Sequence, residues 1–365
     1  MEREHFSKGA SNALKGIVII FMIAHHLFRT PNMYKDFEIC FQPFSEIFIN
    51  RLCTYFKLCV GTFAFVSGYG LAKSFKNSKE AYSKFFFKRY LKTFFPFWIS
   101  YIVIVTASQI IDNSFVSVYF DNDTNLFQGI IYVLLDFLGL SVYTQTPKFI
   151  SEWWYMGACI LFMLIIPAFV KLVQKFGALI PVVLITIIPR ALGIGYLGGT
   201  SPLTFVMAPL LGVIFEHYDL FAKINTFTVP ITKNKYVRKA VTFVLMLSIL
   251  VLSFIFYYKV NARHVWEIHY AIVPTVFIIF FNRYVARWRW IEKALAFIGL
   301  HSANMYIAHM FILKYVKSYI YKMPYFALTV ISLAIMSLVF SIILELIKKL
   351  TRVNKVEKLI LRKIC

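Results

Sequence analysis

The sequence predicts an all-α, polytopic integral membrane protein that folds as a bundle of transmembrane helices. Apolar runs of nearly membrane-spanning length follow one another from one end of the chain to the other. The chain is 59% hydrophobic and 18% aromatic, and its mean hydropathy is +0.69. Its charged residues gather in the short segments between the apolar runs, as expected where loops meet water and helices meet lipid.

Net charge and cysteine pattern exclude two other classes of protein. The 39 Lys and Arg residues exceed the 17 Asp and Glu residues, which gives a net charge of +22. Such an excess can indicate nucleic-acid binding, but cations between apolar runs are the usual mark of cytoplasmic loops. We therefore expect membrane lipids as neighbours and no nucleic-acid partner. The five cysteines show no metal-ligand spacing and no CxxC motif, so no metal cofactor is expected.

About ten apolar runs approach the length that a helix needs to cross a bilayer. In chain order, the predicted spans are about 14–29, 54–72, 94–111, 153–170, 178–197, 202–216, 240–258, 268–282, 302–321 and 325–347. One more apolar stretch, from Leu126 to Tyr143, contains Asp136. A carboxylate at that depth argues against exposure of the stretch to lipid.

The distribution of Lys and Arg predicts the orientation of the spans. With the N-terminus inside, the basic segments 73–92, 223–239 and 283–293 all lie inside, in agreement with the positive-inside rule. This agreement requires the stretch from Leu126 to Tyr143 not to cross. We therefore expect a re-entrant or interfacial helix there, which keeps Asp136 off the lipid.

The chain is expected to form one transmembrane domain over residues 1–347, followed by a basic cytoplasmic tail over residues 348–365. Both termini then lie in the cytoplasm, and the protein is a multi-pass protein of the cell membrane. The sequence does not reveal the oligomeric state.

The first predicted helix, from Leu14 to Phe28, carries a cation at its start and two histidines near its end. A helix turns about 100° per residue, so His26 returns to nearly the face of Lys15, roughly 16 Å further along. His25 points about 80° away from that stripe. The two histidines should therefore differ in role. The alternative for either one is a side chain that hydrogen-bonds within the bundle or meets lipid headgroups.

Five stretches, taken in order, carry a family resemblance. LKGIVIIFMIAHH, VGTFAFVSGYGLAKSF, FFFKRYLKTFFPFW, WWYMGACILFMLIIP and GLHSANMYIAHMFI follow one another over almost the whole chain. Each motif is weak alone, but the ordered set resembles the membrane acyltransferase family often called acyltransferase 3. The resemblance implies an enzyme that moves an acyl group, commonly acetyl, from cytoplasmic acyl-CoA to a hydroxyl of a carbohydrate or lipid-linked glycan.

The resemblance also assigns roles to the first helix. The essential histidine of the family corresponds to His26, and its basic partner corresponds to Lys15. The family more often has Arg at the second position, and Lys keeps the charge but lacks the bidentate fork. A histidine, whose unperturbed pKa is about 6.5, suits a general base at neutral pH. We therefore predict that His26 takes the proton of the acceptor hydroxyl and that Lys15 assists electrostatically.

The cytoplasmic RxxR motif of the family corresponds to Arg89 and Lys92, with one Arg replaced. Coenzyme A carries several phosphate charges, so Lys88, Arg89 and Lys92 are the candidate donor-binding residues. The alternative is that these residues are ordinary positive-inside markers that snorkel to headgroups.

Four aromatic and histidine side chains are candidates for binding the acceptor: Trp153, Tyr155, Tyr306 and His309. The first two stand at a predicted outer boundary, where aromatic belts occur without a binding role. The last two lie three residues apart on one helix face, and the alternative is a polar pair that fastens helices together. Glu152 can orient a base or a sugar hydroxyl, although a solvated loop carboxylate is the simpler interpretation.

Two other functions fit a polytopic protein. A transporter would also carry charged residues at membrane depth, but no inverted repeat or paired broken helices are seen. A non-catalytic scaffold in cell-envelope glycan assembly would keep the same fold without using His26 as a base. Acyl-CoA consumption distinguishes an enzyme from both.

Overall fold

The structure is a computed structural model that describes residues 5–121, 123–260, 262–351 and 359–360. Within these residues the chain is all-helical, which confirms the predicted class. The predicted tail over 348–365 lies mostly outside them. The first eight helices are α1 (Lys8–Phe28), α2 (Glu46–Tyr55), α3 (Leu58–Lys76), α4 (Tyr82–Asp112), α5 (Ser114–Tyr119), α6 (Leu126–Phe137), α7 (Ser141–Thr144) and α8 (Trp154–Phe176).

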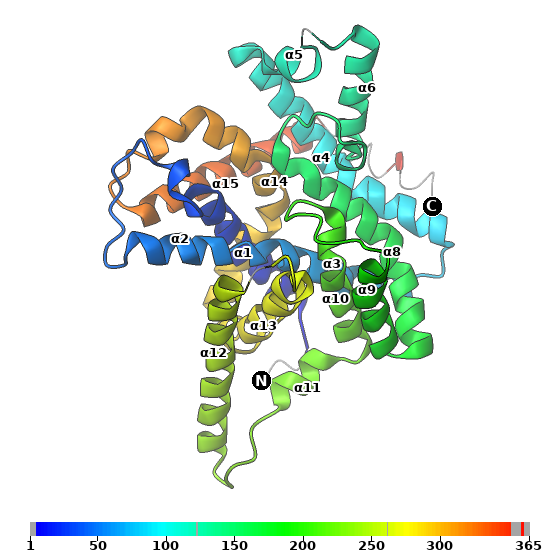
Figure 1. Cartoon of the computed structure of the whole chain (residues 1–365), viewed down its shortest axis with the longest axis vertical. Helices are drawn as coiled ribbons and strands as arrows, with labels where there is room; N and C mark the ends of the chain where they lie inside the picture. The colour runs from blue at the N-terminus through cyan, green and yellow to red at the C-terminus, as the bar shows by residue number, and fades with distance from the viewer. Residues whose placement is uncertain (1–4, 122, 261, 352–358, 361–365) are drawn as a thin grey trace.

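The second half of the chain continues the bundle. Its helices are α9 (Leu179–Ala191), α10 (Met207–His217), α11 (Leu220–Thr226), α12 (Lys235–Lys259), α13 (Val273–Phe280), α14 (Arg289–Ile320) and α15 (Phe326–Leu350). Short 3₁₀ turns are η1 (Pro31–Met33), η2 (Ser151–Trp153) and η3 (Pro202–Phe205), and two π-helical turns, η4 (Ile268–Ile272) and η5 (Phe281–Val285), flank α13. Figure 1 shows α12 projecting from the bundle at the bottom and α5 and α6 at the top.

Among the described residues, eight helical segments are long and apolar enough to cross a membrane, or nine if the bent pair of α10 and α11 counts as one span. The predicted count of about ten is therefore not confirmed. Two predicted spans account for the difference: the one at α10, which is bent by 72° against α11, and the one at α9. The helix α9 has 13 residues and reaches only about 20 Å at 1.5 Å per residue. Its helix ends before Gly193, whose φ of +68° suits glycine rather than a side-chain residue.

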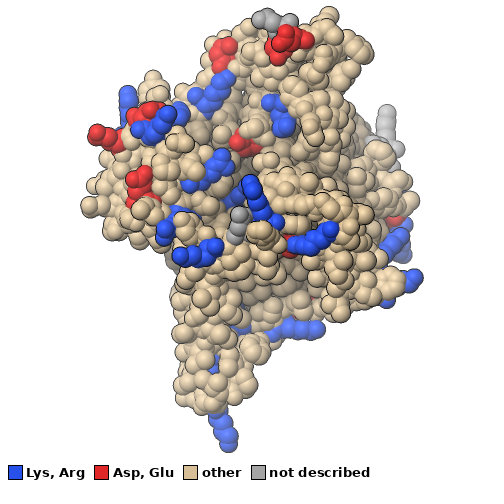
Figure 2. All heavy atoms as spheres, in the orientation of Figure 1, with Lys and Arg blue, Asp and Glu red and all other residues tan. Residues whose placement is uncertain are grey.

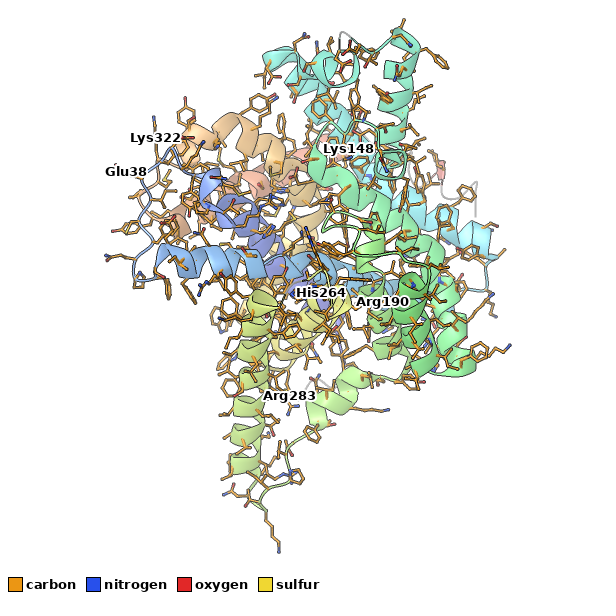
Figure 3. All side chains as sticks on the ribbon, viewed as in Figure 1. Glu38, Lys148, Arg190, His264, Arg283 and Lys322 are labelled. Atoms are coloured by element: carbon orange, nitrogen blue, oxygen red, sulfur yellow. The ribbon has the colours of Figure 1, made fainter. Side chains whose placement is uncertain are left out.

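The end of α9 is joined to another part of the bundle by an ion pair. Arg190, at its end, forms an ion pair with Glu267 just before η4 (2.6 Å), and Figure 3 shows Arg190 beside His264. Glu216, at the end of α10, forms an ion pair with Lys76 at the end of α3 (2.5 Å). These two ion pairs join the end of α9 to the residue before η4 and the end of α10 to the end of α3.

The helix α6 is the apolar stretch that was predicted not to cross. It has 12 residues, which is too short to span a bilayer. Asp136, near its end, is buried and accepts hydrogen bonds from Tyr119 Oη, Ser141 Oγ (3.0 Å) and the backbone N–H of Phe149 (2.8 Å). Burial raises the pKa of the Asp136 carboxyl. Protein donors, and not lipid, therefore surround this side chain.

The helices α1 and α14 run in the same direction and pack closely together through glycine. A Cβ atom on Gly16 would lie 2.0 Å from the carbonyl oxygen of Leu295, and one on Gly299 would lie 1.8 Å from that of Asn12. Small residues let membrane helices approach at backbone distance. The α1–α14 contact is accordingly the most extensive between any two described elements.

A second glycine crossing joins α3 to α10 in antiparallel fashion. A Cβ atom on Gly68 would lie 2.2 Å from the carbonyl oxygen of Pro209, and one on Gly212 would lie 2.3 Å from that of Phe65. The two crossings hold α1, α3, α10 and α14 as the centre of the bundle. The long helix α12 lies outside this centre, and only 6% of its most apolar 18-residue segment is buried by the rest of the protein.

The glycine crossing of α1 and α14 gives a prediction of stability. Gly16→Ala should destabilise the protein by about 1–3 kcal/mol. The new methyl group would overlap the backbone of α14 at Leu295, and that backbone can move only if the whole helix shifts. Gly70→Ala is the matched control on α3, since nothing lies within 4 Å of a Cβ atom there. Thermal melting of both purified variants in one detergent should show a lower Tm for Gly16→Ala only. Equal melting temperatures would contradict the close packing.

Candidate functional site

His26 lies in the last turn of α1, where two other parts of the chain meet it. The Nδ1 atom of His26 is 3.9 Å from Oε1 of Glu152, which belongs to η2. The His26 ring centroid is 5.1 Å from that of His309 on α14. Two imidazoles and a carboxylate from three distant segments are thus brought together.

Glu152 is held in place from both sides. Its Oε2 accepts a hydrogen bond from Ser151 Oγ (2.7 Å), and its backbone carbonyl accepts one from the hydroxyl of Tyr306. A carboxylate that faces Nδ1 of an imidazole favours the tautomer with the proton on that nitrogen. The other nitrogen, Nε2, then has a free lone pair. This is the form of histidine that can accept a proton from a substrate.

His309 is fully buried, and its two ring nitrogens differ in their surroundings. Its Nδ1 donates to the backbone carbonyl of Tyr306 (2.7 Å), while its Nε2 is buried without a hydrogen-bond partner among the described residues. Tyr306 and His309 therefore belong to the surroundings of His26, as their spacing on one helix face allowed.

His25 has a different environment from its neighbour. Its ring is buried, its Nδ1 donates to the carbonyl of Cys53 (2.8 Å), and its Nε2 accepts from Arg29 (3.4 Å). Both nitrogens are therefore engaged within the protein. This arrangement joins the end of α1 to α2 and leaves His25 no free nitrogen for a substrate.

A series of cavities with shared walls leads from His26 to the opposite end of α1. The base cavity, of about 70 Å³, contains His26, and it shares Phe63, Tyr155 and Tyr306 with a middle cavity of about 390 Å³. The middle cavity in turn shares Lys15 and Lys92 with an entry cavity of about 700 Å³. The predicted stripe from Lys15 to His26 therefore lies along a row of neighbouring cavities that share walls.

Cations concentrate around the far end of this row. The entry cavity is lined by Lys8, Lys15, Lys73, Arg89 and Lys92, from the beginning of α1, the end of α3 and the beginning of α4. It shares Gly70, Lys73 and Arg89 with a neighbouring basic cavity of about 530 Å³.

Two of the predicted donor residues have protein partners in the basic cavity. Arg89 donates to Ser74 Oγ, and Lys88 forms an ion pair with Glu80 (2.7 Å). The Lys88 ammonium lowers the pKa of the Glu80 carboxyl. Lys88 is therefore partly neutralised, whereas Lys15 and Lys92 line both the entry cavity and the middle cavity.

The predicted aromatic residues fall into two groups. Tyr155 and Tyr306 line both the base cavity and the middle cavity, with ring centroids 5.9 Å apart. Trp153 is buried elsewhere: its Nε1 donates to the carbonyl of Ile307 (3.0 Å), and its ring packs edge-on against Phe97. Its neighbour Trp154, which was not among the predicted site residues, lines the base cavity instead.

Three charged residues at the base cavity were not predicted as site residues. Glu152 was considered as a residue that orients a base or a sugar hydroxyl, but a loop carboxylate was preferred. Arg29 and Lys57 were not singled out, yet all three line the cavity. The available signal was the presence of Lys57 inside an apolar stretch, because ionisable residues at such positions are usually functional. Among residues 5–121, 123–260, 262–351 and 359–360, no group of His, Cys, Asp or Glu is arranged to hold a metal ion.

Comparison with protein-family models identifies a family for this chain. The model of the Acyl_transf_3 family, described as an acyltransferase domain, matches residues 9–346, which is almost the entire chain. Searches of curated proteins and of solved structures found no match.

The two adjacent histidines should respond differently to substitution. His25→Ala leaves the Cys53 carbonyl without its donor, and an unsatisfied buried polar group costs about 1–3 kcal/mol. His26→Ala removes no hydrogen bond that the structure shows. Melting of both variants in the same detergent should therefore give a clearly lower Tm for His25→Ala alone, and the reverse order would contradict the assignment of His25 as the structural residue.

Proposed function

This chain belongs to the Acyl_transf_3 family of acyltransferase domains, and we propose that it is a multi-pass membrane O-acyltransferase that uses cytoplasmic acyl-CoA. The simplest acyl group is acetyl, and the acceptor is a hydroxyl of a cell-surface or lipid-linked glycan. One observation supports this proposal above the others. A row of neighbouring cavities with shared walls lies between a cluster of cations and a histidine that faces a carboxylate.

The cationic end suits the donor. Arg89 offers a guanidinium that can bind a phosphate through paired hydrogen bonds, and Lys15 and Lys92 act as point charges beside it. With the nucleotide held there, the narrow arm of the coenzyme would run through the middle cavity toward His26. The distance along α1 from Lys15 to His26 is roughly 16 Å.

The other end suits proton transfer. With Glu152 facing Nδ1, Nε2 of His26 takes the proton of the acceptor hydroxyl as its oxygen attacks the thioester carbonyl. A carbon–oxygen bond forms, the carbon–sulfur bond breaks, and the imidazolium returns its proton to the leaving thiolate. Glu152 stabilises that imidazolium. Tyr155 and Tyr306 form the wall against which a sugar ring can stack.

The first test of this function is turnover of acetyl-CoA by purified protein in nanodiscs with cell-envelope extracts as acceptors. His26→Ala should lower acceptor-dependent release of CoA by about 10²- to 10⁴-fold, the usual contribution of a general base. His25→Ala, compared per folded molecule, should retain turnover. Glu152→Gln should fall between them, because it keeps the shape but not the charge that orients His26.

If both histidine variants match the wild type while transfer persists, another residue is the base. If no extract supports consumption of acyl-CoA, the enzyme proposal is wrong and a transporter or scaffold becomes the better interpretation.

The second test concerns the donor site. Lys15→Gln and Arg89→Gln should each raise the KM for acetyl-CoA by about tenfold, because each removes a charge-assisted contact to phosphate. Lys171→Gln is the matched control: this exposed lysine near the end of α8 lines none of the cavities described here. An unchanged KM in both test variants would exclude the entry cavity as the donor site.

A further inference from the structure

The base cavity contains two cations that the proposed transfer does not use. Arg29 caps the end of α1 one turn beyond His25, and Lys57 immediately precedes α3. Both line the same cavity as His26 and Glu152. Arg29 is exposed and Lys57 is half-buried, and the two charges come from the ends of different helices. Figure 2 shows Lys and Arg side chains over the region of α1 and α3.

Neither cation forms an ion pair with a carboxylate in the part of the chain that the structure describes. Arg29 donates to Nε2 of His25 (3.4 Å), and the Lys57 ammonium lies 5.7 Å from the centre of the Tyr270 ring. Glu152 is the carboxylate that lines this cavity, and it already faces His26 and Ser151. The nearby Glu267 is paired with Arg190.

Two cations beside a single carboxylate leave the base cavity with an excess of positive charge. A half-buried ammonium without a counter-charge is unfavourable unless a ligand supplies one. Arg and Lys that converge from two directions suit a group with several oxygens that point different ways, as in phosphate, better than a planar carboxylate.

We propose that Arg29 and Lys57 bind a phosphate group of the acceptor and thereby place its hydroxyl beside Nε2 of His26. This proposal rests on the proposed function and names the class of acceptor: a phosphate-bearing one. Neutral glycans lack the group that these two side chains hold.

The phosphate can belong to a lipid-linked acceptor or to a soluble phosphorylated glycan. Gly199 and Thr200 line the base cavity, and Leu197 and Leu203, just beside them, line an apolar cavity of about 310 Å³. A hydrocarbon chain would have a place there. The test therefore includes both sources.

The decisive experiment measures binding and so does not depend on catalysis. Native mass spectrometry of the purified protein compares a polyprenyl phosphate, the matching polyprenol and glucose 1-phosphate as ligands. The wild type should bind the polyprenyl phosphate at least about tenfold more tightly than the polyprenol. The Arg29→Gln/Lys57→Gln variant should lose this preference. Lys35→Gln, an exposed lysine in the same interhelical segment as Arg29, should keep it.

Glucose 1-phosphate distinguishes a lipid-linked acceptor from a soluble phosphorylated glycan. Binding of glucose 1-phosphate as tight as that of the lipid phosphate, lost in the same variant, would assign the site to soluble phosphates. A double variant that melts like the wild type but still prefers phosphate would overturn the proposal. The single variant Arg29→Lys, with Lys57 unchanged, keeps the positive charge and should retain most of the preference for the polyprenyl phosphate over the polyprenol.

A kinetic comparison then separates acceptor binding from a general effect on the reaction. For acceptors that differ only by a phosphate, the double variant should raise the KM of the phosphorylated one by about tenfold or more and leave the neutral one unchanged. A fall in kcat for both acceptors alike would mean that the cations stabilise the transition state, and the acceptor proposal would then be wrong.

Discussion

The close contact of α1 with α14 fixes the rest of the site. Gly16 and Gly299 bring the two backbones together, and ten residues further along each helix stand His26 and His309. The two helices run in the same direction, and each histidine follows its glycine by the same number of residues. The two histidines therefore lie close together, with ring centroids 5.1 Å apart. The position of the base therefore depends on a pair of residues without side chains, far from the reacting atoms.

The sequence was most informative where one helix carries the whole pattern. The stripe from Lys15 to His26 follows from helix geometry alone, and the structure places both residues on one row of cavities. The structural difference between His25 and His26 was also predictable, because it depends on the direction of two side chains along a single helix. The all-helical class followed from composition.

What could not be predicted depends on contacts between distant segments. Glu152 is 126 positions from His26, and no local pattern shows that its carboxylate faces an imidazole. Trp153 and Trp154 are neighbours and both are buried, but Trp153 packs against α4 and α14 while Trp154 lines the base cavity, which the sequence does not reveal. The length of α9 depends on where Gly193 takes a positive φ, which an apolar run of residues does not reveal.

The isolation of α12 has a mechanical consequence. This helix contacts chiefly α2 and α13, and little of its surface is covered by protein. In a bilayer thinner or thicker than its apolar length, α12 can relieve the hydrophobic mismatch by changing its tilt. The paired helices α1 and α14, locked at their glycines, have no such freedom. Changes in lipid thickness should thus be absorbed at the periphery, and the distance between the reacting groups should stay the same.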